Sequence, residues 1–171
     1  YEFVFGLVGS EMCIRDRIRR IIYEDALARI LELCKGETNS VALMATIVCE
    51  IHNSDDRFDW TGFYRVTEPR VLKVGPYQGG HGCLRIPFNR GICGQVASTG
   101  KPHLINDVSS VQNHIACSPT TKSELVVPVF NGLKGLIAVL DIDSDLPAAF
   151  NADDTNGLLK IINSIFSRDI M

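Results

Sequence analysis

The pattern of apolar and polar positions changes along the chain from helical to alternating and back again. From residue 18 apolar side chains recur at the three- and four-residue spacing of one helix face, and a second such run covers residues 41–48. Residues 58–66 and 71–77 are aromatic and β-branched around a turn, which predicts a β-hairpin. A second hairpin is predicted around Asn131-Gly132, and a closing helix from about Ala152, with Asn151 as its N-cap.

The middle of the chain is less regular. Short strands are predicted near residues 84–88 and 103–106, with a short helix between them that ends at Gly100. Residues 109–122 form a long polar loop, and such a loop inside a compact domain usually carries function. The order of elements predicts one α+β domain: a mostly antiparallel sheet with helices on one face and irregular loops on the other.

The first residues have a different character from the rest. Residues 11–17 resemble the translation of a sequencing adapter read in frame, and residues 1–10 show no helical or alternating continuity with the residues after them. We therefore expect residues 1–17, including Cys13, to be non-native, and residues 18–171 to form the single domain.

Composition narrows the class of function. A net charge of −3 gives no electrostatic reason to expect nucleic acid or an anionic membrane as partner. No stretch approaches the ~20 consecutive apolar residues of a membrane span, and no basic region precedes the apolar start as in a signal peptide. Six cysteines in 171 residues are too sparse for a secreted disulfide scaffold, so a reducing cytoplasm is the expected location.

The cysteines after residue 17 divide by context. Cys34 and Cys49 lie in helical patterns among apolar residues and are expected to be small core side chains. Cys83, Cys93 and Cys117 lie in glycine-rich or polar loops, where packing does not explain them. They therefore indicate chemistry.

Two kinds of chemistry suit these loop thiols. In redox chemistry one thiolate attacks a substrate and a second thiol resolves the product as a disulfide. Cys93, near a helix start, and Cys117, three residues after His114, both have a means of lowering a thiol pKa. Zinc binding is the alternative, but its ligand set lacks the paired Cys-x-x-Cys of structural zinc sites: Cys83, Cys93, His114 and Cys117.

Acidic and aromatic residues form a second candidate group. Asp141 and Asp143 alternate along a predicted strand and so face one side, and Glu124 lies on the partner strand. Solvated strand-end carboxylates are the simpler explanation, but three together suit an ammonium site or a proton donor. Trp60 and Tyr64 also share a strand face; they are either core residues or a wall for an apolar part of a ligand.

Seven segments resemble the successive motifs of the free methionine-(R)-sulfoxide reductases. They are WTGFY at 60–64, GPYQG at 75–79, CLRIPF at 83–88, RGICG at 90–94, HIAC at 114–117, SELVVP at 123–128 and VLDID at 139–143. The resemblance covers residues 18–166. Asn89 stands where the family pattern has glycine, and residues 111–114 replace a proline-containing turn.

The resemblance implies a GAF fold with a roughly six-stranded sheet. It also implies a homodimer, to which the wide apolar surface of the last helix would contribute. Cys117 would attack the sulfoxide sulfur and be left as a sulfenic acid. Cys83 would then form a disulfide with it, with Cys93 as an auxiliary thiol. Thioredoxin, kept reduced by NADPH, would restore the thiols, and no bound cofactor is implied.

The remaining roles concern the substrate, free methionine (R)-sulfoxide. Three carboxyl groups would bind its ammonium and protonate or hydrogen-bond the sulfoxide oxygen, two aromatic rings would hold its S-methyl end, and a loop backbone would bind its carboxylate. These residues are Glu124, Asp141 and Asp143; Trp60 and Tyr64; and Ile115, Ala116 and Cys117. A non-catalytic GAF sensor for a cyclic nucleotide or other small molecule is the alternative, against which the loop cysteines argue.

Overall fold

The structure is a computed structural model that describes residues 3–111 and 118–167, with side chains described from residue 14 onward. Its strands form one antiparallel sheet in the order β3-β2-β1-β6-β5-β4. The strands are β1 (Trp60–Glu68), β2 (Val71–Gln78), β3 (Arg85–Pro87), β4 (His103–Ile105), β5 (Ser123–Phe130) and β6 (Leu136–Ser144). The α+β fold class and the six antiparallel strands predicted from the sequence are confirmed.

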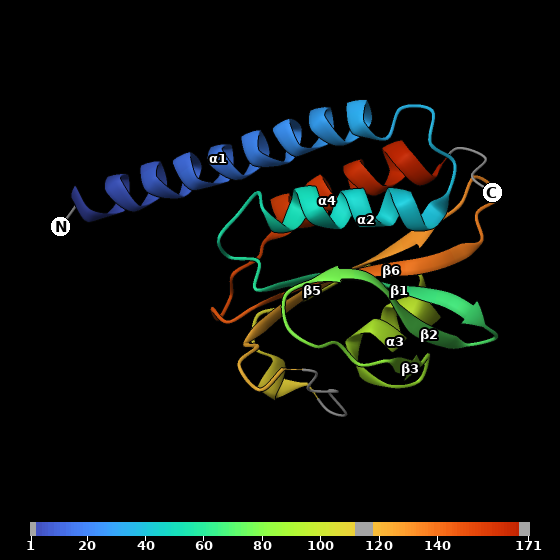
Figure 1. Cartoon of the computed structure of the whole chain (residues 1–171). Helices are drawn as coiled ribbons and strands as arrows, with labels where there is room; N and C mark the ends of the chain where they lie inside the picture. Colours follow the sequence, from blue (N-terminus) through green and yellow to red (C-terminus); the bar gives the residue numbers. More distant parts are fainter. Residues whose placement is uncertain (1–2, 112–117, 168–171) are drawn as a thin grey trace.

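The helices lie on both sides of this sheet. Figure 1 shows α1, α2 and α4 above it and α3 below it, on the side of the loops. Their bounds are α1 (Phe3–Leu33), α2 (Ser40–His52), α3 (Gly91–Thr99) and α4 (Ala152–Phe166), with a short 3-10 helix, η1 (Val108–Ser110). None of the helices in the described part of the chain combines the length and apolarity that crossing a bilayer requires.

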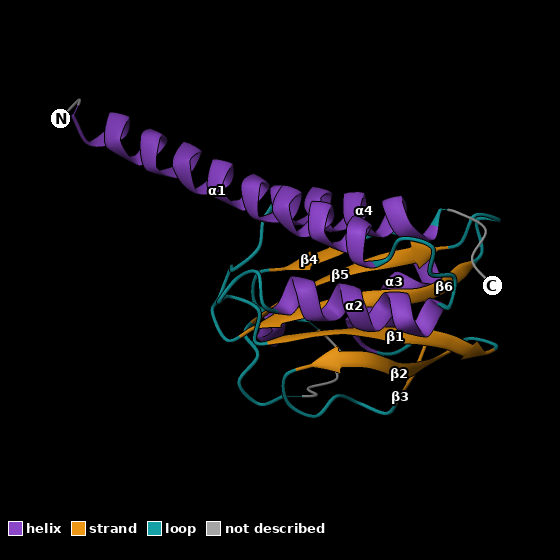
Figure 2. Cartoon of the chain, turned by 45° about the horizontal axis from the view of Figure 1, so that its top comes forward, coloured by secondary structure: helices purple, strands orange, loops and turns teal. Residues whose placement is uncertain are grey.

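Helix α1 begins at Phe3, well before the start expected near residue 18. The expectation of no helical continuity before that point was wrong, because no proline interrupts residues 3–33 and two glycines only weaken a helix. The N-terminal part of α1 extends past the rest of the domain (Figure 2). Whether residues 1–17 are native stays a prediction.

Alternation along the strands separates two cores. Leu140 and Ile142 of β6 join the core beneath α1, α2 and α4, whereas Val139 joins the smaller core beneath α3. Asp141 and Asp143 share the parity of Val139, so both side chains face the side of α3 and the loops. The sheet thus assigns bulk packing to one face and polar chemistry to the other.

Helix α4 is packed between α1 and the sheet. Leu158, Ile161, Ile162, Ile165 and Phe166 are all buried in the larger core of this chain. The wide apolar surface of this helix is therefore explained by contacts on two of its sides. Whether this helix also contributes to a dimer interface stays a prediction.

A buried ionic cluster fixes the start of α4. Asn151 caps the helix, as predicted, and Asp154 completes a capping box. The fully buried Asp154 carboxylate also accepts hydrogen bonds from Arg57 Nη2 at 2.9 Å and Tyr23 Oη at 3.0 Å. This cluster joins α4 to α1 and to the loop before β1.

Candidate active site

The three candidate carboxyl groups lie on adjacent strands because of the strand register. Glu124 of β5 pairs with Asp143 of β6, and Asp143 pairs with Trp60 of β1. Asp141 lies two residues before Asp143 on the same face of β6, opposite Gly62. The grouping of these carboxyl groups with Trp60, expected from the sequence, is thus present in the structure.

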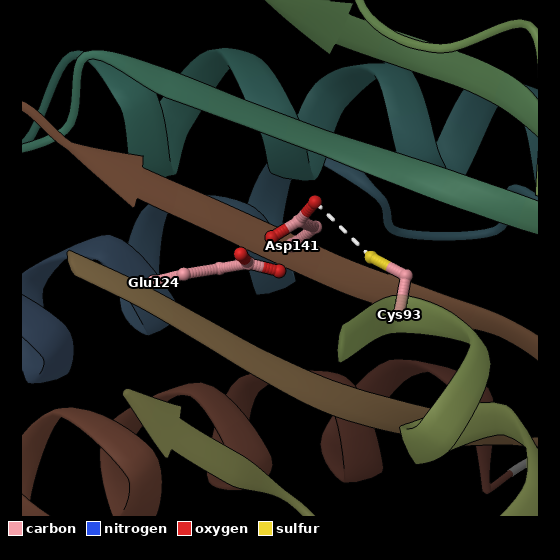
Figure 3. A group of neighbouring side chains, drawn as sticks. All are labelled: Cys93, Glu124 and Asp141. Atoms are coloured by element: carbon pink, nitrogen blue, oxygen red, sulfur yellow. Dashed lines mark hydrogen bonds between the residues drawn. The ribbon is translucent and has the colours of Figure 1, made fainter. Parts of the chain in front are cut away.

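Cys93 approaches this group from the other direction. Helix α3 packs on β5 and β6 and places the Cys93 Sγ 3.1 Å from Asp141 Oδ2, to which the thiol donates a hydrogen bond. Figure 3 shows Cys93, Asp141 and Glu124 directed toward a common point from three different elements. One ligand atom from each lies within 4.8 Å of the others, and the three residues are only 4–6% exposed.

Burial and mutual repulsion favour the neutral forms of the carboxyl groups. Burial, followed by the nearby Asp143, raises the pKa of Glu124 well above its usual range. Burial and Glu124 do the same to the pKa of Asp141. Burial raises the pKa of Asp143, and Asp141, Asp145 and Asp59 raise it further. The site therefore contains carboxyl groups that keep protons to a higher pH than carboxyl groups in water.

One oxygen atom of the Asp141 carboxyl group lacks a hydrogen-bond partner among the described residues. This atom, Oδ1, is buried. None of the lysines, arginines and histidines that the structure describes forms an ion pair with Asp141 or Asp143. An unpaired buried oxygen costs free energy, so this position suits a positively charged or hydrogen-bond-donating ligand.

The environment of Cys93 differs from the one expected. Cys93 does lie in the first turn of α3, which was expected to lower its pKa. Instead, burial raises the pKa of the Cys93 thiol well above its usual value, and the Asp141 and Glu124 carboxyl groups raise it further. The prediction was wrong because burial and the carboxyl groups across the sheet outweigh the effect of the helix terminus. Cys93 is a neutral thiol here.

A stack of aromatic rings forms the wall of the site. The centroid of the Trp60 ring lies 5.6 Å from the centroid of the Tyr64 ring and 5.5 Å from that of the Tyr77 ring, and the Trp60 ring is nearly parallel to both. The indole Nε1 donates a hydrogen bond to the carbonyl of Gly80 at 3.1 Å, which fixes the plane of the ring. A Cβ on Gly62 would stand 2.4 Å from the Trp60 ring, so the stack requires a glycine there.

A pocket of about 450 Å³ opens beside this wall. This volume lies within the usual range for small-molecule sites of about 300–1,000 Å³. Asp59, His81 and Asp145 line this pocket and were not among the residues singled out from the sequence. The pocket is lined by Asp59, Trp60, Gly80, His81, residues 118–121, Asp143 and Asp145.

The remaining predicted residues are the other cysteines and the residues of the 114–117 segment. Cys83, half-buried between β2 and β3, takes part in a disulfide whose partner is not among the described cysteines. Cys34 is a buried free thiol, as expected, whereas Cys49 is exposed, so its assignment to the core was wrong. Four predicted residues lie outside the described part of the chain: His114, Ile115, Ala116 and Cys117.

The fold and the buried site define the class of protein: residues 24–165 match the GAF domain family. A free methionine-R-sulfoxide reductase of Escherichia coli is 34% identical over 82% of this chain and 84% of its own length. The structure of a free methionine-R-sulfoxide reductase of Neisseria meningitidis in complex with its substrate is 36% identical with a TM-score of 0.80, covering 86% of this chain and 87% of that one. A putative GAF sensor protein of Burkholderia vietnamiensis is 32% identical, also with a TM-score of 0.80, covering 87% of this chain and 93% of that one. The chain belongs to the GAF domain family, within the group of the free methionine-R-sulfoxide reductases, which are oxidoreductases.

Proposed function

We propose that the protein reduces free methionine (R)-sulfoxide to methionine in the pocket beside Trp60. The observation that carries this proposal is the group of three buried carboxyl groups, with raised pKa values, next to an aromatic wall. The substrate complex of the Neisseria meningitidis relative supports it, because that protein has the same fold at 36% identity.

Reduction of the sulfoxide requires a carboxyl group that is still protonated, so that it can donate a proton to the sulfoxide oxygen. A sulfoxide oxygen leaves poorly until it receives a proton, so an acid close to it is needed. Asp143 lines the pocket, and Glu124 lies opposite it in the sheet. We assign Asp143 and Glu124 the proton transfer and hydrogen bonding to this oxygen. Glu124, Asp141 and Asp143 together bind the substrate ammonium.

The S-methyl end and the carboxylate of the substrate are assigned to other residues of the site. The S-methyl end is held by Trp60, which lines the pocket, and by Tyr64, whose ring stacks on that of Trp60. The substrate carboxylate binds the backbone N–H groups around Ile115, Ala116 and Cys117. A pocket that holds both charged ends of a free amino acid rejects the same side chain within a polypeptide, because its buried polar groups would lose their partners.

The redox steps use two thiols. Cys117 attacks the sulfoxide sulfur; the oxygen is transferred to the cysteine, methionine is released, and Cys117 is oxidised to a sulfenic acid. The Cys83 thiol then displaces water from this sulfenic acid and forms a Cys83–Cys117 disulfide. A thioredoxin dithiol, itself reduced by NADPH, takes up the disulfide and restores both thiols. The participation of Cys83 in a disulfide supports its role as the resolving thiol.

Cys93 has an auxiliary place in this scheme. Its thiol is buried, neutral and hydrogen-bonded to Asp141. Exchange with the Cys117–Cys83 pair requires Cys93 to leave Asp141 and lose its proton. We also propose a cytoplasmic location and a homodimer.

The test is turnover of free methionine (R)-sulfoxide and (S)-sulfoxide with thioredoxin recycling. We expect turnover of the R form alone, and none by the Cys117→Ser variant. Folded, reduced protein without turnover would favour the second candidate, a small-molecule sensor, which the similarity to a putative GAF sensor supports. A sensor would keep its ligand affinity in the Cys117→Ser variant.

A further inference from the structure

We propose that Cys93, Glu124 and Asp141 also form a binding site for a thiophilic divalent cation, Zn²⁺ in particular, whose occupancy excludes the substrate. The three side chains come from α3, β5 and β6 and converge on one point (Figure 3). The proposal that the metal binds here is argued from the geometry of these three side chains alone. Its effect on turnover rests on the function proposed above.

The geometry requires only small movements. In a tetrahedral zinc site with Zn–S near 2.3 Å and Zn–O near 2.0 Å, ligand atoms lie roughly 3.3–3.5 Å apart. Cys93 Sγ and Asp141 Oδ2 are already 3.1 Å apart, and all three ligand atoms lie within 4.8 Å of one another. Glu124 has three side-chain torsions with which to close the remaining distance.

A second observation points to a cation. Asp141 Oδ1 is buried and has no hydrogen-bond partner among the described residues, while Oδ2 of the same carboxyl group faces the Cys93 thiol. A metal ion that binds both oxygens of the Asp141 carboxylate would satisfy the unpaired Oδ1. It would also neutralise the charges of two neighbouring carboxylates, which repel one another when both are ionised.

The ligand types select the metal. One thiolate with two carboxylates suits zinc, which accepts sulfur and oxygen ligands together, whereas magnesium and calcium bind oxygen ligands. Binding displaces the proton of the Cys93 thiol. Three protein ligands leave a fourth position for water.

The site overlaps the one assigned to the substrate. Glu124 and Asp141 are the carboxyl groups that we assign to the substrate ammonium, so metal and ammonium cannot occupy them together. By linkage each ligand lowers the affinity of the other by the same factor. Zinc is therefore expected to act as a competitive inhibitor, and the substrate to protect the protein from zinc.

The experiment uses the full chain with Cys83→Ser and Cys117→Ser, which removes the two thiols of the proposed redox steps, and with them turnover, and keeps Cys93. Titration of this reduced protein with Cd²⁺ reports thiolate binding through its ultraviolet charge-transfer band, and calorimetry with Zn²⁺ gives affinity and stoichiometry. We expect one equivalent of each metal. The band is lost with Cys93→Ala, and Glu124→Gln or Asp141→Asn weakens Zn²⁺ binding by more than about tenfold.

The control variants are Cys13→Ser and Cys49→Ser, which remove thiols outside the cluster and are expected to leave the titration unchanged. A charge-transfer band that persists in a folded Cys93→Ala protein overturns the proposal, as does one that depends on Cys13 or Cys49. Glu124→Gln preserves side-chain shape, so unchanged Zn²⁺ affinity in that variant also overturns it. Thermal unfolding of each variant identifies any that fail to fold.

Two outcomes separate the site from the proposed function. If Zn²⁺ binds through Cys93 but the protein with its native cysteines reduces no methionine sulfoxide, the proposed function fails and the metal site stands. If the sulfoxide is reduced but no metal binds at Cys93, the metal site fails alone. Competition is measured in the double variant: free methionine (R)-sulfoxide is expected to weaken Zn²⁺ binding, and an unchanged Zn²⁺ affinity at saturating sulfoxide contradicts the overlap.

Discussion

The Sγ atom of Cys93 donates a hydrogen bond to Oδ2 of Asp141 across 3.1 Å, and this contact joins helix α3 to strand β6 at the floor of the site. Both side chains are buried, and Oδ1 of the same carboxyl group has no partner among the described residues. The hydrogen bond from Cys93 therefore fixes the orientation of the Asp141 carboxyl group. This positioning role can be separated from thiol redox chemistry by variants.

Replacing Cys93 with serine keeps a donor, whereas alanine removes it from a buried carboxyl group. We expect Cys93→Ser to retain most turnover, and Cys93→Ala to raise the KM for the sulfoxide several-fold. Leaving a buried acceptor unpaired costs about 1–3 kcal/mol, so the alanine variant should also be less stable. Steady-state kinetics and urea unfolding measure both effects. Equal loss of kcat in both variants, without loss of stability, would show instead that the sulfur itself reacts.

The aromatic wall depends on glycine at position 62. An alanine Cβ there would stand 2.4 Å from the Trp60 ring and displace it from its stack with Tyr64 and Tyr77. We expect Gly62→Ala to raise the KM and to lower stability by about 1–3 kcal/mol, as overpacking usually does. Kinetics beside denaturation curves test this.

A matched control comes from helix α4. Gly157 has the same kind of contact, with a Cβ position 2.4 Å from the ring of Tyr23, but on the face of the sheet away from the pocket. Gly157→Ala should lose stability and keep the KM of the parent. A similar KM increase in both variants would mean that the effect at Gly62 is general loosening of the fold.

Asp154 is expected to be a major determinant of stability. Its carboxylate is fully buried between Arg57, Arg19 and Tyr23, so Asp154→Ala leaves Arg57 without one of its two carboxylate partners. Removing one partner of a buried ion pair costs about 3–5 kcal/mol. Neighbouring Asp153 is partly exposed and forms a 3.9 Å ion pair with the exposed Arg20, so Asp153→Ala should change stability by less than about 1 kcal/mol. Equal effects in urea unfolding would contradict this assignment.

The same cluster gives a pH dependence. Burial alone would raise the pKa of Asp55, but its hydrogen bonds and ion pair with Arg57 outweigh burial and lower it. A carboxyl group with a lowered folded-state pKa contributes stability above its unfolded pKa of about 3.9, and this contribution is lost as the pH falls through the folded value. Asp55→Asn should therefore reduce the loss of unfolding free energy on acidification. The expectation is refuted if the unfolding free energies of the parent and Asp55→Asn proteins fall in parallel as the pH is lowered.

Local sequence signals predicted much of the fold. The second hairpin, the cap at Asn151, and the end of α3 at Gly100 depend on a few adjacent residues, and all are confirmed. The placement of Asp141 and Asp143 on one face also follows from strand alternation, which is local.

The electrostatics of the site could not be predicted in this way. The pKa of Cys93 is raised by burial and then by Asp141 and Glu124. These residues lie far along the sequence and meet Cys93 only when α3 packs on β5 and β6. Asp59 and His81 likewise become pocket residues only through the folding of loops around Trp60. The start of a helix near Cys93 could be predicted from the sequence, but the position of the carboxyl groups beside it could not.

The pairing of β6 with β1 and β5 also makes catalytic competence a measure of correct folding. A shift of one residue in this pairing would bring Leu140 and Ile142 to the pocket face and turn Asp141 and Asp143 into the apolar core. A chain in the wrong register would therefore lose its carboxyl group site and its packing together. In a preparation refolded from denaturant, specific activity reports the fraction of molecules whose central strand is in register.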